Sequence, residues 1–144
     1  MTTQKRYALA PTLLFLMLAA ACNAVGATPT PTTAPAPAGG DADVTEAWAA
    51  TAAHYRGNTG ERYDYDCPAG GEPHIVWGTD TYTDDSSVCT AAVHLGEITL
   101  EDGGTVTIEI ADGEDSYEGT ERNGIETSDY PSWPGSFVFV LETD

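Results

Sequence analysis

The chain has 144 residues and a formal net charge of −18, because 23 acidic residues face only five lysines and arginines. So acidic a surface repels a phosphate backbone, which excludes nucleic acid as a partner. The remaining interpretations of this acidic surface are solubility, salt tolerance or the binding of a cationic partner.

Residues 1–21 are predicted to be a signal peptide. Lys5 and Arg6 precede an uncharged run, Tyr7 to Ala21, which ends in small residues, and this is the pattern of a secretory signal. The run is about 15 residues long, whereas a membrane-spanning helix needs roughly 20. Without this segment the chain keeps three arginines against all 23 acidic residues.

The four residues Ala19-Ala20-Ala21-Cys22 resemble a bacterial lipobox, in which the cysteine receives a diacylglyceryl group and becomes the mature N-terminus. Most lipoboxes carry leucine three residues before the cysteine, where this chain has Ala19. We expect Cys22 to carry acyl chains such as palmitate and to anchor the protein at the extracytoplasmic face of the membrane, because two chains suffice where one does not. The alternative is ordinary cleavage near residues 25–27, which would give a secreted protein.

Residues 22–42 comprise the lipidated cysteine and a linker rich in proline, threonine and alanine. Its alternating prolines favour an extended, polyproline-like spacer and exclude both a helix and a sheet ladder. Such a spacer lifts a domain off the lipid headgroups. Threonines beside prolines are also candidates for O-glycosylation.

An odd number of cysteines in an exported protein requires an explanation of the leftover thiol. If Cys22 carries lipid, Cys67 and Cys89 remain as a pair. An oxidising compartment then permits a disulfide between them. The lipobox interpretation therefore accounts for all three cysteines.

Residues 43–144 have the size of one domain and are predicted to be mostly β. The Ala-rich segment 44–55 is compatible with a helix and receives no assignment. Alternating or β-branched and aromatic runs predict strands at Arg62–Cys67, His74–Gly78, Thr105–Ile110 and Ser136–Leu141. The last run is apolar on both faces, so we expect it in the centre of a sheet.

One short helix is expected among these strands. Asp84 or Asp85 can cap its N-terminus, and Gly96 can adopt the left-handed conformation after its end. The segment Val88–Leu95 is apolar apart from one threonine and one histidine, so the helix should be buried on most sides. The expected fold is α+β, mostly β, with this helix enclosed by strands.

The run VWGTDTYTDDSSVCTAAVHLG, residues 76–96, is similar to the signature of the LCCL domain family. YRGNTGERYDYDCPAGG before it, and GGTVTIEI and SWPGSFVF after it, extend the resemblance over roughly residues 48–140. The resemblance implies a β-sandwich-like sheet wrapped around one short central buried helix. It also implies an accessory module of extracellular proteins, some of which are linked to lipopolysaccharide or lipid recognition and host defence. The chain thus resembles a bacterial LCCL-domain lipoprotein.

The cysteines depart from the family pattern. The animal family typically has four cysteines in two bridges, whereas this chain keeps only Cys67 and Cys89 and has Gly71 where the Cys-Pro-x-x-Cys pattern has its second cysteine. Each remaining cysteine has therefore lost its usual partner, and the family's connectivity does not carry over. We predict a new disulfide between Cys67 and Cys89.

No constellation of residues supports an enzyme, a metal site or a cofactor. Cys89 and His94 lie about 140° apart around a helix, too far for a thiol–imidazole pair, so His94 is expected in the core with its ring nitrogens bonded to the backbone. Together with His54 and His74 it does not form a zinc pattern. The acidic turns ADGEDSYEG and TDTYTDD lack the ligand spacing of a calcium loop.

Trp133 and Tyr130 are the best candidates for a ligand contact. Trp133 lies among Pro131, Pro134 and Gly135, in a loop where an exposed indole can stack on a sugar or contact lipid; the alternative is that it fills the core. The sequence therefore predicts a non-enzymatic binding or adhesion module for an unidentified lipid, glycan or protein. The alternative is a structural cell-envelope protein with an acidic spacer domain and no specific ligand.

Overall fold

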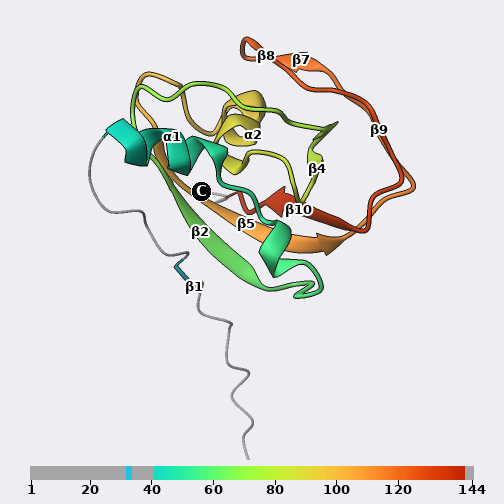
Figure 1. Cartoon of the computed structure of the whole chain (residues 1–144). Helices are drawn as coiled ribbons and strands as arrows, with labels where there is room; N and C mark the ends of the chain where they lie inside the picture. The colour runs from blue at the N-terminus through green and yellow to red at the C-terminus, as the bar shows by residue number, and fades with distance from the viewer. Residues whose placement is uncertain (1–31, 34–40, 142–144) are drawn as a thin grey trace, which may run out of the picture.

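The computed structural model describes residues 32–33 and 41–141. The expected signal peptide and Cys22 lie outside these residues. A six-stranded sheet in the order β1-β2-β5-β10-β4-β3 passes on one side of a short central helix, α2 (Figure 1). The predicted class, α+β and mostly β with one short central buried helix, is confirmed.

Three antiparallel strands form the centre of the sheet: β2 (Arg62–Cys67), β5 (Gly104–Asp112) and β10 (Gly135–Phe139). In β2 and β5 the side chains alternate between core and surface, as strand geometry requires, whereas the first three residues of β10 are all buried. Tyr63 pairs with Ile108, and Phe137 pairs with Ile110. The core face carries side chains that are at most 7% exposed, contributed by Tyr63, Tyr65, Cys67, Val106, Ile108, Ile110 and Phe137.

The helix α2 (Val88–Leu95) is the centre of the core, and all its residues except the last are buried. The Ser87 hydroxyl accepts a hydrogen bond from the Thr90 N–H, and Gly96 ends the helix with φ of 95°. The Gly96 cap is as predicted, but the N-cap is not Asp84 or Asp85. Because Ser87 caps the helix two or three residues later than expected, Asp84 is available for a different contact.

The disulfide between Cys67 and Cys89 is present, which confirms the predicted pairing. It joins the end of β2 to the first turn of α2, and both cysteines are buried, with exposures of 2% and 0%. The helix is therefore covalently attached to the sheet that packs against it.

The Ala-rich segment without an assignment forms α1 (Asp41–Ala49), followed by a 3-10 turn, η1 (Ala53–Tyr55). Trp48 is fully buried, and its indole N–H donates to the Pro68 carbonyl at 2.9 Å. A Cβ added to Gly71 would lie 1.9 Å from the Trp48 ring, so only glycine fits there. This indole therefore fixes the chain just after β2.

The linker prediction is wrong at two places. Thr32 and Thr33 form β1, which pairs in parallel with Tyr63 and Asp64 of β2, and α1 begins at Asp41 inside the predicted spacer. The two threonines keep the backbone N–H groups that the neighbouring prolines lack. A short ladder is therefore compatible with this composition.

Two strand predictions need correction in extent, and one is wrong. The strand predicted at Thr105–Ile110 extends to Gly104–Asp112, and the one at Ser136–Leu141 is Gly135–Phe139, central as expected. Of His74–Gly78, only Gly78 belongs to a strand, β3 (Gly78–Thr79). Backbone N–H groups of this segment donate to hydroxyls instead, His74 to Thr90 and Trp77 to Ser86.

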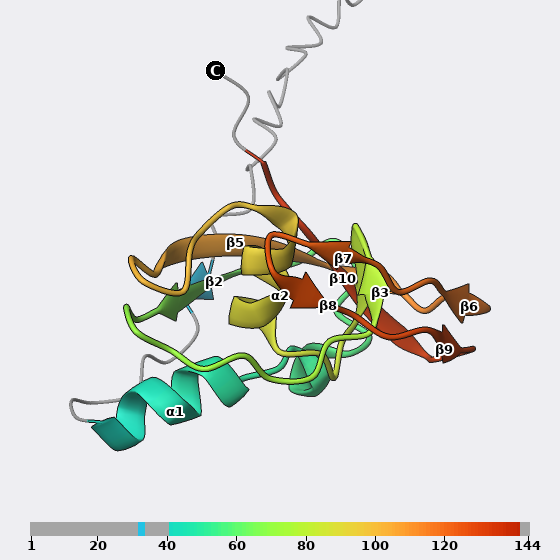
Figure 2. The same ribbon diagram turned by 90° about the horizontal axis from the view of Figure 1, so that it is seen from above.

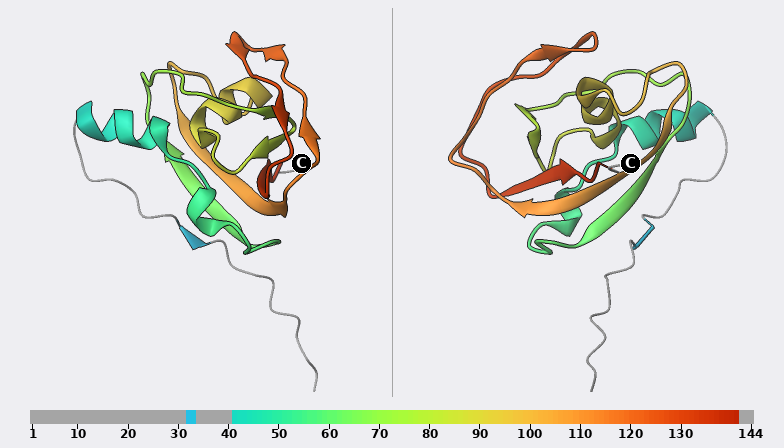
Figure 3. Two further views of the ribbon diagram at one scale, coloured as in Figure 1. Left: turned by 45° about the vertical axis from the view of Figure 1, so that its right-hand side comes forward. Right: turned by 180° about the vertical axis from the view of Figure 1, so that it is seen from behind.

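Residues 113–134, here called the arm, leave the sheet after β5 and return to it at β10. The arm consists of two short ribbons, β6–β9 and β7–β8, and it bends around the outside of α2 and β4 (Thr81–Thr83) (Figure 3). Positive φ at Asn123 and Gly124 gives the two-residue turn typical of a tight hairpin. The four strands are β6 (Ser116–Tyr117), β7 (Glu121–Arg122), β8 (Ile125–Glu126) and β9 (Tyr130–Pro131).

Different elements form the two ends of the molecule. Figure 2 shows α1 at one end and β6 with β9 at the other. β1 lies at the sheet edge formed by β2, whereas β3 forms the opposite edge.

The base of the arm is held by the Tyr117 hydroxyl, which accepts from the Glu114 N–H and lies 2.6 Å from the Ser136 hydroxyl.

Candidate functional site

Three partly exposed aromatic residues, Trp77, Tyr130 and Trp133, form a continuous row that we call the aromatic strip. The Tyr130 ring lies between the two indoles, with ring centroids 5.4 Å from Trp77 and 5.5 Å from Trp133. Both contacts are edge-to-face, the arrangement favoured by the quadrupoles of aromatic rings. Trp77 precedes β3, Tyr130 belongs to β9, and Trp133 lies in the turn before β10.

An ion pair between the fully buried Asp84 and the partly exposed Arg56 holds one end of the strip. Asp84 is fully buried, and its carboxylate accepts from Arg56 Nε and Nη2, both at 2.7 Å, and from Trp133 Nε1 at 2.8 Å. The Arg56 guanidinium also lies over the indole, with its carbon 5.1 Å from the Trp133 ring. The hydrogen bonds to Asp84 raise the pKa of Arg56. The orientation of Trp133 is therefore fixed by its N–H and by one of its faces.

The backbone around the Trp133 indole is also closely packed. The Trp133 N–H donates to the Glu114 carbonyl at 3.1 Å, and the Asp84 N–H donates to the Gly135 carbonyl at 3.0 Å. A Cβ at Gly135 would lie 2.1 Å from the Asp84 carboxylate, and one at Gly113 would lie 1.8 Å from the Trp133 carbonyl oxygen. Two glycines thus make room for the turn that presents the indole.

Trp133 matches neither of the two alternatives drawn from the sequence, an exposed loop residue or a core residue. It is neither a free loop residue nor a core residue, because it is partly exposed while its N–H is bonded to a buried carboxylate. Tyr130 is also partly exposed, and the two predicted residues are brought together. Their role as a ligand contact stays a prediction.

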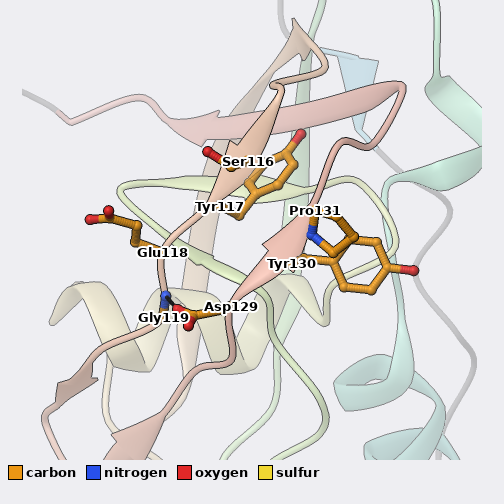
Figure 4. Close-up of a pocket in the computed structure, with 7 residues that line it drawn as sticks. All are labelled: Ser116, Tyr117, Glu118, Gly119, Asp129, Tyr130 and Pro131. Carbon is orange, nitrogen blue, oxygen red and sulfur yellow. Dashed lines mark hydrogen bonds between the residues drawn. The ribbon is translucent and has the colours of Figure 1, made fainter.

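A pocket of about 510 Å³ adjoins the strip at Tyr130. Figure 4 shows Tyr130 and Pro131 on one side, Glu118 on the other, and Asp129 with Gly119 between them. The Gly119 N–H donates to Asp129 Oδ1 at 2.7 Å. Because β6 and β9 form the walls, the paired ribbon positions both an aromatic residue and carboxylates around one opening.

All three arginines among the described residues are paired with carboxylates. Arg56 binds the buried Asp84, while Arg62 binds Glu109 at 2.9 Å and Arg122 binds Asp80 at 2.6 Å near the surface. No lysine occurs after Lys5. The surface of the described residues is therefore acidic, and its cations are already neutralised locally.

His94 is a core residue, as predicted, but its partners differ. It is fully buried, and its ring nitrogens contact hydroxyls rather than the backbone: Nδ1 lies 2.9 Å from the Tyr82 oxygen and Nε2 3.2 Å from Thr120 Oγ1. Burial lowers the pKa of His94 and raises the pKa of Tyr82 to about 12. Cys89 is in the disulfide, so the two do not form a catalytic pair.

The buried imidazole predicts a loss of stability in mild acid. Because the pKa of folded His94 is below the ordinary value of about 6.5, the unfolded chain binds a proton that the folded chain does not as the pH falls below 6.5. The free energy of unfolding should therefore decrease from pH 7.5 towards pH 5. Asp80 and Arg122, the charged groups that act on the ring, form an ion pair and do not reverse this sign.

Urea unfolding of His94→Gln checks this expectation. Its stability should change less between pH 7.5 and pH 5 than that of the parent, although it is lower throughout. His74→Gln, at an exposed histidine, should keep the parent's pH dependence. An equal pH dependence in all three proteins would assign the acid sensitivity to the carboxylates instead.

Among the described residues, no three histidine, cysteine or acidic side chains come close enough to share a metal ion. His54 and His74 are exposed and His94 is buried, so these three do not meet. The acidic turns ADGEDSYEG and TDTYTDD contribute Glu114, Glu118 and Asp80 to a second pocket of about 390 Å³, in which Arg122 is the cation.

Sequence reasoning missed Arg56 and Asp84 as parts of the site, and it gave Trp77 no role of its own. One signal was available: with only three arginines against 23 acidic residues, each arginine is a scarce cation. The sequence does not identify Asp84 as the partner of Arg56, because Asp84 lies 28 residues from Arg56 and 49 from Trp133.

Together these features define a small, disulfide-linked α+β domain in which a mostly antiparallel sheet packs against a buried helix and an arm contributes two of the three rings of an aromatic strip. Residues 43–137 match the family model described as "LCCL domain", about two thirds of the chain, and the chain belongs to the LCCL domain family.

Similar curated proteins share only this domain. Human vitrin is 40% identical over 79 residues, covering 54% of this chain and 11% of vitrin. Guinea-pig (Cavia porcellus) cochlin is 38% identical over 80 residues, covering 54% of this chain and 14% of cochlin. Human cysteine-rich secretory protein LCCL domain-containing 2 is 44% identical over 52 residues, covering 36% and 10%. The chain thus spans about a tenth of the length of these relatives.

Proposed function

We propose that the protein is an extracytoplasmic, membrane-anchored LCCL-domain lipoprotein that acts as a non-enzymatic binding module, with the aromatic strip as its contact surface. The observation that carries this proposal is the strip itself, three partly exposed rings in mutual contact and anchored at one end by Asp84. Rings held in place lose little conformational freedom on binding. Aromatic residues so placed are typical binding hot spots.

The position of the strip suits display away from a membrane. β1, the described segment nearest in sequence to Cys22, lies at the β2 edge of the sheet, whereas Trp77 lies beside β3 at the opposite edge. Figure 1 accordingly shows β1 and β9 on opposite sides of the molecule. A tether at β1 would thus leave the strip facing outward.

Binding of the purified full chain to a printed glycan array, and to phosphatidylcholine vesicles with and without phosphatidylglycerol, tests the strip. Tyr130→Ala and Trp133→Ala should each weaken binding by about 1–3 kcal/mol, the scale of a stacking aromatic. Tyr55→Ala is the matched control, because this partly exposed ring stacks on Tyr63 of β2 instead. Variants that bind every probe as the parent does would exclude the strip as the contact and leave the acidic spacer role.

Thermal melts of the same variants separate contact from core. Loss of the Trp133 ring also removes the N–H bond to Asp84, worth about 1–3 kcal/mol as a bond to a charged group. Tyr130→Ala should therefore melt closer to the parent than Trp133→Ala. A loss of about 3–5 kcal/mol at Tyr130 would be that of a core residue and would remove it from the site.

Membrane anchoring through Cys22 is tested by Cys22→Ser. No described helix is long and apolar enough to cross a membrane, and a relative named as a secretory protein supports export. The variant should appear in the medium or as an unprocessed precursor, because the acceptor of the acyl chains is gone. Correctly processed Cys22→Ser that still needs detergent for release from the membrane would contradict the anchor.

A further inference from the structure

The charges of the site restrict the chemistry of its ligand. Arg56 is the cation of the strip, yet two of its nitrogens bind Asp84 and Asp85 adds a further attraction. The other two arginines of the described residues are also paired. A phosphate, sulfate or carboxylate would therefore approach without a free cation to bind it, against an acidic surface.

A cationic ligand fits the strip no better. A cation is held by aromatic faces that converge on it, whereas these rings meet edge-to-face, with interplanar angles of 61° and 88°. The Trp133 ring also has the Arg56 guanidinium over it. That face of the indole is therefore already occupied.

The pocket beside the strip calls for a ligand that donates hydrogen bonds. Its volume is about 510 Å³. Glu118 and Asp129 line it, and ionised carboxylates only accept. Asp129 Oδ1 is oriented by the Gly119 N–H, while the structure gives Asp129 Oδ2 and the Glu118 carboxylate no partner among the described residues. An acyl chain would desolvate these oxygens without compensation.

We infer that the strip and the adjoining pocket bind a neutral saccharide. Such a ligand presents C–H faces for the rings and hydroxyls that donate to Glu118 and Asp129, and it carries no charge to be repelled. Tyr130 belongs to both the strip and the pocket, so a saccharide that extends from the strip into the pocket can contact both the rings and the carboxylates. This inference rests on the proposed function, because it names the ligand class of the same site.

The test uses the purified full chain on an array of neutral glycans, with sulfated glycans, poly-lysine and phosphatidylglycerol vesicles as alternatives. The best neutral glycan should be retained in 0.5 M salt, and its sulfated counterpart should bind at least tenfold more weakly. Glu118→Ala and Asp129→Ala should each weaken binding about ten- to hundredfold, the range for a hydrogen bond to a charged group. Glu121→Ala and Glu126→Ala are the controls, because these exposed residues face each other on the neighbouring β7–β8 ribbon and should bind as the parent does.

The outcomes separate the saccharide inference, the role of the pocket and the proposed function. Strip-dependent binding to poly-lysine or to anionic vesicles, with an empty neutral array, overturns the saccharide inference while the binding module stands. Neutral glycan binding that is unaffected by both pocket variants removes the pocket from the inference and overturns it in this form. Binding of any probe that survives Tyr130→Ala and Trp133→Ala unchanged contradicts the proposed function as well.

Discussion

Replacing Ala92 with aspartate should prevent the domain from folding. Ala92 is fully buried in α2, and its carbonyl accepts from the Gly96 and Glu97 N–H groups at 3.0 Å. A carboxylate there would be surrounded by the core and would lack a cation. Its burial costs several kcal/mol or more, which is comparable with the whole free energy of unfolding of a small domain, about 5–15 kcal/mol.

Circular dichroism melts of the purified variants measure this effect, with Glu114→Lys as the control. The Glu114 residue is exposed, and its hydrogen bonds are made by its backbone N–H and carbonyl, so its substitution should change stability by less than about 0.5 kcal/mol. A cooperative Ala92→Asp transition close to that of the parent would show that α2 is peripheral, contrary to its place in the structure.

The parts of the fold that sequence predicts are those governed by local pattern. The alternation in Arg62–Cys67 and Thr105–Ile110 specifies which side chains face the core, and β2 and β5 pair along that register. The helix follows from an apolar run closed by Gly96, whose positive φ suits glycine. In each case the sequence pattern that predicts the element lies within the element or at its end.

The parts that sequence does not predict depend on long-range contacts. His74–Gly78 has the composition of a strand, yet the N–H groups of His74 and Trp77 donate to the Thr90 and Ser86 hydroxyls. Asp84 has the position of a helix cap, yet it is buried and binds Arg56 and Trp133. The strip likewise requires the arm to return beside β3, which composition does not reveal.

The second large effect is expected at the ion pair under the strip. Arg56→Met should lower the free energy of unfolding by about 3 kcal/mol, because removing one partner of a buried pair leaves an uncompensated charge. Asp84 is fully buried while the Arg56 side chain is 37% exposed, so the lower end of the usual 3–5 kcal/mol range applies. Urea unfolding at pH 7.5 gives the value directly.

Arg62→Met is the matched control, since its pair with Glu109 is 43% and 34% exposed and such surface pairs contribute about 0–1 kcal/mol. Equal losses in the two variants would mean that the buried carboxylate is not what makes Arg56 necessary. The double variant Arg56→Met with Asp84→Asn isolates the charge. An asparagine oxygen still accepts the Trp133 N–H but needs no cation, so the double variant should be more stable than Arg56→Met alone and should keep the indole in place for its ligand.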